Sequence, residues 1–116
     1  MSEKQRTIAK EISLNGKGLH TGIDVTITFK PAPPNHGYKF CRIDLPGKPV
    51  IDALAENVTD TSRGTTLMQN NASVSTIEHV LAAFHGLRVD NALIELNGPE
   101  APIMGGASWK FVEAIK

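Results

Sequence analysis

Apolar and polar residues alternate between residues 23 and 29, and this run constrains the fold more than any other part of the chain. Ile23, Val25, Ile27 and Phe29 fall on alternate positions, which is the pattern of a half-buried β-strand. Prolines and a glycine then break the chain between residues 31 and 37. The run therefore predicts a strand with one face toward a core.

Other segments predict more strands and two helices. Residues 5–14 are predicted to form a strand and residues 15–22 (NGKGLHTG) a glycine-rich turn, so that the two strands pair as a hairpin with a long connection. Further strands are expected at residues 38–45, 65–68 and 92–96, with a turn at Asn70-Asn71, and helices at residues 75–84 and 108–116. Strands come first and helices later, which predicts an α+β fold. The expected form is a mainly antiparallel or mixed β-sheet with two helices packed on one side.

Length and composition favour one ordinary globular domain. The 116 residues include 12 Lys and Arg against 12 Asp and Glu, which gives no electrostatic reason to bind nucleic acid or an anionic membrane surface. The single cysteine, Cys41, fits a reducing compartment. The polar N-terminus has no secretory apolar segment, and no apolar run approaches the roughly 20 residues of a membrane span. A soluble cytoplasmic protein is expected.

The helix at residues 75–84 begins with a recognisable N-terminal signature. Ser75 and Glu78 have the spacing of a capping box, in which each side chain accepts a hydrogen bond from the backbone N–H of the other residue. On the residues alone, this structural role is favoured for Glu78 over catalysis. An apolar stripe follows at Ile77, Val80, Leu81 and Phe84, spaced for a helix with one buried face.

The opposite face of this helix carries small residues in place of the usual lysines and glutamates. His79 shares it with Ala82, Ala83 and Gly86, because successive residues turn by about 100°. Small uncharged residues predict that another part of the protein packs closely here. The alternative is a short exposed helix that uses alanine for its high helix propensity.

The first turn of this helix is compatible with a metal ligand. A helix N-terminus stabilises a carboxylate such as Glu78 and disfavours a charged imidazole, and neutral imidazole is the form that binds metal. A catalytic zinc needs about three protein ligands. The spacing of the four histidines supplies no such set, and none of the common zinc, calcium or phosphate-loop motifs is present.

Several motifs together resemble the UDP-3-O-acyl-N-acetylglucosamine deacetylase family, a family of bacterial zinc enzymes of lipid A synthesis. They are GKGLHTG at residues 16–22, TSRGTTL at 61–67, STIEH at 75–79, Asp90-Asn91, and NGPEAPIM at 97–104. Their order and spacing match the first half of the family. The STIEH helix start combined with the GKGLHTG turn is highly specific.

The resemblance implies a role for individual residues. Glu78 matches the general base that activates a zinc-bound water, and His79 matches one zinc ligand. The residues that match positions bordering the substrate are Leu19, His20, Arg63 and Gly64. The family has two similar α+β lobes facing each other across the site, and it removes acetate from a UDP-linked, 3-O-acylated glucosamine.

The resemblance also implies that this chain is only part of the enzyme. Residues 1–116 correspond to the N-terminal domain, and the other zinc ligands, the acid histidine and most uridine contacts come from the second half. One departure is Gly105, where the family commonly has aspartate. The competing hypothesis is a non-catalytic binding or regulatory module that reuses this lobe. Retention of both Glu78 and His79 favours the enzyme lobe.

Overall fold

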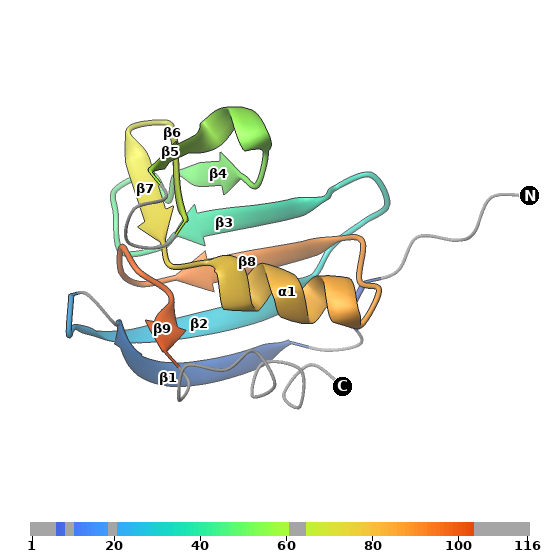
Figure 1. Cartoon of the computed structure of the whole chain (residues 1–116), viewed down its shortest axis with the longest axis horizontal. Coiled ribbons are helices and arrows are strands. Elements are labelled where there is room, and N and C mark those ends of the chain that lie inside the picture. Colours follow the sequence, from blue (N-terminus) through green and yellow to red (C-terminus); the bar gives the residue numbers. More distant parts are fainter. Residues whose placement is uncertain (1–6, 9–10, 19–20, 61–64, 104–116) are drawn as a thin grey trace, which may run out of the picture.

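The computed structural model describes residues 7–8, 11–18, 21–60 and 65–103, and it has the predicted α+β class. Figure 1 shows helix α1 (Glu78–Gly86) covering one face of a large sheet, with a smaller sheet beside it. In chain order the elements are β1 (Ile12–Gly18), β2 (Asp24–Pro31), β3 (Tyr38–Arg42), β4 (Val50–Asp52), a 3₁₀ turn η1 (Ala55–Asn57), β5 (Val58–Asp60), β6 (Thr66–Gln69), β7 (Ala72–Ser75), α1 (Glu78–Gly86), β8 (Ala92–Leu96) and β9 (Pro102–Ile103). The second helix expected at residues 108–116 lies outside the described residues. Within the described ones, no helix is long and apolar enough to cross a membrane.

Six strands form the large sheet, in the order β4-β3-β8-β2-β1-β9. Neighbouring strands are antiparallel except β3 and β8, which are parallel, so the sheet is mixed as predicted. The predicted hairpin is confirmed: β1 and β2 pair from Ile12 opposite Phe29 to Lys17 opposite Asp24. Its connection is shorter than expected, because β1 continues to Gly18.

The prediction that residues 15–18 belong to a turn is therefore wrong. Gly16 pairs with Val25 and Lys17 with Asp24, and an ion pair of 3.1 Å joins the last two side chains. Lys17 and Gly18 also pair with β9 on the other side. Glycine is a weak strand former, but here hydrogen bonding to two neighbouring strands keeps it extended. Of the strand predicted at residues 5–14, the structure shows Ile12 to Leu14 in β1, while residues 5–6 and 9–10 lie outside the described residues.

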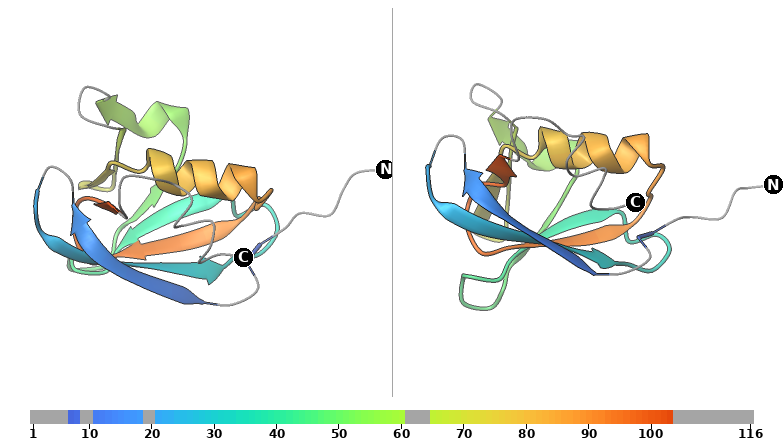
Figure 2. Two further views of the ribbon diagram at one scale, coloured as in Figure 1. Left: turned by 60° about the horizontal axis from the view of Figure 1, so that its bottom comes forward. Right: turned by 90° about the horizontal axis from the view of Figure 1, so that it is seen from below.

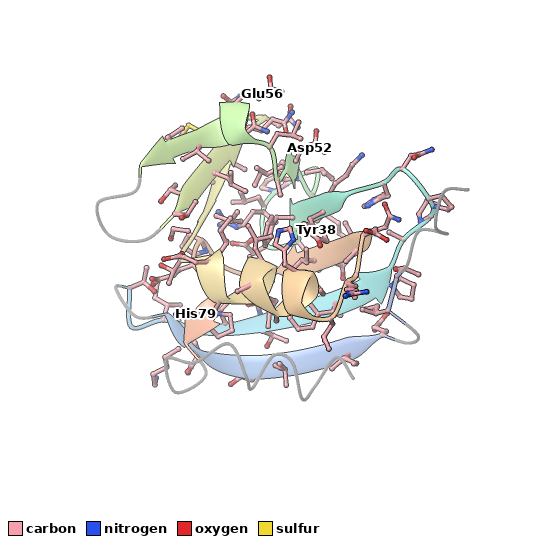
Figure 3. The ribbon with its side chains drawn as sticks, turned by 45° about the vertical axis from the view of Figure 1, so that its right-hand side comes forward. Tyr38, Asp52, Glu56 and His79 are labelled. Carbon is pink, nitrogen blue, oxygen red and sulfur yellow. The ribbon has the colours of Figure 1, made fainter. Side chains whose placement is uncertain are left out.

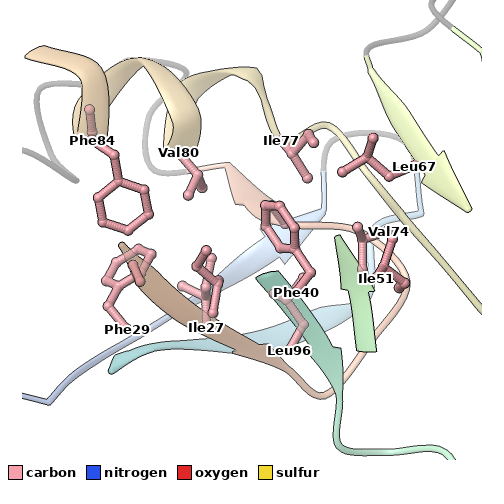
Figure 4. Close-up of a cluster of buried hydrophobic side chains, with 14 of the residues drawn as sticks. Ile27, Phe29, Phe40, Ile51, Leu67, Val74, Ile77, Val80, Phe84 and Leu96 are labelled. Carbon is pink, nitrogen blue, oxygen red and sulfur yellow. The ribbon is translucent and has the colours of Figure 1, made fainter. Parts of the chain in front are cut away.

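The core lies between the large sheet and α1 (Figures 2 and 4). The alternation in β2 is confirmed, since Val25, Ile27 and Phe29 are at most 2% exposed, whereas Ile23 precedes the strand and is 52% exposed. Phe84 packs edge-on against Phe29 with ring centres 5.4 Å apart. Burial of this face explains why a helix of only nine residues is stable here.

The small sheet, β5-β6-β7, shares the hydrophobic core of the large sheet and is also attached to it by polar side chains. Its β6–β7 hairpin turns at Asn70-Asn71, as predicted, with positive φ angles of 55° and 62° that suit a two-residue type I′ turn. The Asn70 amide donates to the carbonyl of Val50 in β4. The buried Arg42 of β3 donates to the carbonyl of Ser73 in β7. These bonds fix the small sheet beside the N-terminal end of α1.

The predicted capping box is wrong. Helix α1 begins at Glu78, and its N-cap residue, Ile77, makes no side-chain cap hydrogen bond. Ser75 ends β7, and both its backbone N–H and its hydroxyl donate to the carbonyl of Pro99. Ser75 is thus held by a neighbouring segment and starts no helix.

Acid should remove a stabilising contact at Arg42. This guanidinium donates two hydrogen bonds, of 2.9 and 2.8 Å, to the carboxylate of Asp44, and the pairing lowers the pKa of that carboxyl below its ordinary value. A carboxyl whose pKa is lower in the folded state stabilises the fold above its ordinary pKa, and the contribution is lost as the pH falls toward the folded value. We therefore expect Asp44→Asn to lower stability at neutral pH and to flatten its decline below pH 4, measured by urea unfolding at several pH values. The control is Asp24→Asn, which breaks an exposed pair and should cost less than about 1 kcal/mol. Parallel acid curves for Asp44→Asn and the parent would contradict the assignment.

Candidate functional site

The candidate site is the N-terminal end of α1, where strand β7 leads almost directly into the helix. Two residues, Thr76 and the fully buried Ile77, separate Ser75 of β7 from Glu78. This short connection places Glu78 and His79 in the first helical turn, and Figure 3 labels His79 there. Glu78 is exposed and His79 is half-buried. The pair is therefore available at the surface on a rigid element.

Glu78 is held by a backbone contact from the residue that precedes β6. Its Oε1 accepts a hydrogen bond of 3.1 Å from the N–H of Thr65, which immediately precedes β6. The carbonyl of Thr65 in turn accepts from the N–H of Thr76. The first helical turn adds the favourable field of the helix N-terminus. Together these contacts hold an exposed carboxylate in one place.

The prediction that His79 shares one helix face with Ala82, Ala83 and Gly86 is partly wrong. Ala82 and Gly86 are exposed, but Ala83 is 1% exposed and belongs to the core. At about 100° per residue, Ala83 lies only about 60° around the helix from the buried Val80. The buried face of α1 is therefore rotated from the predicted stripe toward His79. Leu81, on the side of this face away from His79, is partly exposed. His79 is half-buried and lies next to Ala83 at the edge of the buried face.

The four residues expected to border the substrate, Leu19, His20, Arg63 and Gly64, lie outside the described residues. Their described neighbours lead to the helix start from two directions. Thr65, next to Gly64 in sequence, contacts Glu78. Thr21, next to His20, donates its N–H to the carboxylate of Glu100, which also accepts from the hydroxyl of Thr76. Thr65 therefore contacts the predicted site directly at Glu78, and Thr21 is linked to it through Glu100 and Thr76.

Glu100 and Thr76 were missed as candidates by the sequence analysis. Glu100 is 1% exposed, although its sequence setting, between Pro99 and Ala101, gives no periodic signal of burial. The one available sign was a charged residue in a short, mainly apolar segment after a strand. Its importance becomes visible only when the fold brings two separate segments, at Thr21 and Thr76, to its carboxylate.

The described residues alone contain no group of three or more His, Cys, Asp or Glu side chains able to hold a metal. A hollow of about 790 Å³ exists, but it lies at the other end of α1, lined among others by Tyr38, Asp52, His85 and Arg88. Figure 3 labels Tyr38 and Asp52 apart from His79. We place the candidate site at Glu78 and His79, because the hollow holds neither residue.

Fold and site together define an α+β lobe that presents a fixed carboxylate and a neighbouring imidazole at the start of its helix. The chain belongs to the UDP-3-O-acyl N-acetylglycosamine deacetylase family, whose model matches residues 5–116. It is 57% identical over 113 residues to the bifunctional enzyme LpxC/FabZ of Bacteroides thetaiotaomicron, covering 97% of this chain and 24% of that protein. It is 50% identical over 115 residues to the UDP-3-O-acyl-N-acetylglucosamine deacetylase of Myxococcus xanthus, covering 99% of this chain and 37% of that protein. The chain thus spans between a quarter and somewhat over a third of the length of these relatives.

Proposed function

We propose that this chain is the N-terminal lobe of a zinc-dependent amidase that removes acetate from UDP-3-O-acyl-N-acetylglucosamine in lipid A biosynthesis. The carrying observation is the Glu78–His79 pair at the start of α1, in a chain of this deacetylase family. Relatives that are UDP-3-O-acyl-N-acetylglucosamine deacetylases by name supply the substrate. The lone cysteine, Cys41, is a buried free thiol, which supports a reducing, cytoplasmic setting.

Glu78 is suited to act as the general base. One of its oxygens is held by the Thr65 N–H, so that the carboxylate has a defined orientation without being buried. In the proposed reaction it takes a proton from the attacking water, while a C–O bond forms and the amide C–N bond breaks. A separate acid, outside the described residues, protonates the leaving amine. The products are acetate and the free 2-amino sugar.

The residues present fit zinc only as part of a larger site. His79 would be one ligand, and Glu78 lies beside it as an unligated carboxylate. Bound zinc lowers the pKa of a coordinated water and polarises the substrate carbonyl. A catalytic zinc usually has three protein ligands, and the described residues contain no group of three or more His, Cys, Asp or Glu side chains able to hold a metal. We therefore assign the remaining ligands to a second domain, and Leu19, His20, Arg63 and Gly64 to the substrate side of the site.

Residues 1–116 by themselves should show no deacetylase turnover. The reason is the incomplete ligand set, because one histidine cannot hold a catalytic zinc. The measurement compares acetate release from the UDP-sugar by this chain and by the complete protein, both supplied with Zn²⁺. We expect activity only from the complete protein. Turnover by residues 1–116 would contradict the shared site, and an inactive complete protein with bound zinc would contradict the proposed function.

A further inference from the structure

We propose that Glu100 is a positioning residue for the deacetylation: its carboxylate fixes the end of β1 against the start of α1 and so sets the place of Glu78 and His79. This inference rests on the proposed function for its catalytic consequence. The structural link on which it depends can be measured without activity. Glu100 lies between β8 and β9, in a segment that runs beside the end of β7.

The Glu100 carboxylate joins two distant parts of the chain. Its Oε1 accepts a hydrogen bond of 2.9 Å from the N–H of Thr21, and its Oε2 accepts one of 2.6 Å from the hydroxyl of Thr76. Thr21 follows β1, whereas Thr76 lies two residues before Glu78. A carboxylate can serve two donors at once in this way, and bonds to a charged acceptor are short and strong.

Gly18 shows how closely the carboxylate approaches β1. A Cβ atom at position 18 would lie 2.3 Å from Oε1 of Glu100 and 2.5 Å from the Thr21 hydroxyl, far inside normal contact. Glycine is therefore needed here for space, because any side chain would displace the carboxylate. The carboxylate can therefore lie this close to β1 because residue 18 has no side chain.

Thr76 shows that the link holds a strained backbone. Its φ is +58°, a left-handed conformation that is a genuine outlier for a β-branched residue. Such strain persists only where surrounding contacts impose it, and it is concentrated at functional sites. Here the Thr76 hydroxyl is bound by Glu100, and its N–H is bound by the Thr65 carbonyl. This conformation turns the chain from β7 into α1 and thereby aims the first helical turn.

Burial separates Glu100 from an ordinary surface carboxylate. The residue is 1% exposed, and Ala101 beside it is equally buried and donates its N–H to the Ser75 carbonyl. A buried charge is costly unless well hydrogen-bonded, and stability alone is often served as well by an apolar residue of the same size. A carboxylate at this position therefore fits a role in fixing the geometry of the helix start.

The test uses isosteric pairs in the complete protein. Thr76→Val removes the hydroxyl but keeps the shape, and Thr76→Ser keeps the hydroxyl. Glu100→Met removes both acceptors at similar volume. We expect Thr76→Val and Glu100→Met to lower kcat by about 10²-fold, since a displacement of about 1 Å at a reacting centre has that effect. Thr76→Ser should stay close to the parent. Rates are measured per bound zinc, well below the Tm of each variant.

Two further measurements separate positioning from simple stability. The double variant Thr76→Val with Glu100→Met should lose no more activity than Glu100→Met alone, because both changes break one link. Hydrogen exchange at the Thr21 amide should be faster in Glu100→Met. Equal kcat for Thr76→Val and Thr76→Ser, or multiplying losses in the double variant, would overturn the proposal. If Glu100→Met does not fold, the two Thr76 variants decide. If the complete parent protein has no deacetylase activity but Thr21 exchange is faster in Glu100→Met, the structural link through Glu100 is supported and the proposed function is contradicted.

Discussion

Replacing Glu78 by glutamine in the complete enzyme is expected to lower kcat by about 10²-fold or more, the loss typical of a missing general base. Glutamine is the informative substitution because its side-chain oxygen can still accept the hydrogen bond from the Thr65 N–H. The contact that holds the helix start is therefore retained while the proton-accepting group is removed. Steady-state kinetics on the UDP-sugar, with metal analysis of the same samples, measures the effect.

Zinc content and unfolding temperature are the controls for Glu78→Gln. Both should remain near those of the parent, because Glu78 is not a proposed ligand and the helix has no capping box to lose. Glu78→Ala should show the same loss of kcat with an added loss of stability, since it also removes the acceptor for Thr65. An unchanged kcat with a lowered Tm in both variants would show that Glu78 is only a structural residue.

The sequence predicted those parts of the fold that depend on local patterns. The alternation in β2 placed Val25, Ile27 and Phe29 in the core correctly, because one buried face imposes a period of two. Asn70-Asn71 was recognised as a turn because asparagine tolerates the left-handed conformation that the hairpin requires. Both signals act between close neighbours, so a single sequence contains them in full.

The wrong predictions arose where distant segments decide the local structure. Ser75 has a capping-box spacing, but Pro99 binds both its N–H and its hydroxyl, and the helix begins three residues later. Gly16 and Gly18 resemble turn residues, yet pairing with neighbouring strands extends them. The burial of Glu100 likewise depends on Thr21 and Thr76, which are separated from it by 79 and 24 positions.

At the start of α1, the sequence predicted which chemical groups are present but not how they are oriented. The resemblance predicts that Glu78 and His79 belong to the site, and the structure places them side by side in the first turn of α1. The partner of Glu78 could not be predicted, because Thr65 reaches it through the β6–β7 hairpin. A motif thus records which groups are present, while their orientation comes from contacts made by other strands.

Arginine substitutions at the adjacent Ala82 and Ala83 are expected to have very different effects on stability, because only Ala83 lies on the buried face of α1. Ala83→Arg should destabilise the lobe by about 4 kcal/mol or more, because it forces a charge and a long side chain into a packed core. Ala82→Arg should change the stability of the lobe by no more than about 0.5 kcal/mol, since Ala82 is exposed. Chemical denaturation of the two variants under the same conditions measures the difference. Similar unfolding midpoints would contradict the orientation of α1.

Ala82→Arg also tests what covers the exposed side of this helix in the complete enzyme. Ala82 and Gly86 are small, and they lie on the same side of α1 as His79. If another domain supplies the remaining zinc ligands, it must approach His79 closely, and an arginine at position 82 would stand in its path. We therefore expect Ala82→Arg to retain a folded lobe but to lose deacetylase activity and bound zinc. The matched control is His85→Arg, which changes an exposed residue near the opposite end of α1 and should leave activity near that of the parent. Full activity and full zinc content with Arg at position 82 would show that this face is ordinary solvent-exposed helix, and the second domain would then have to reach His79 from another side.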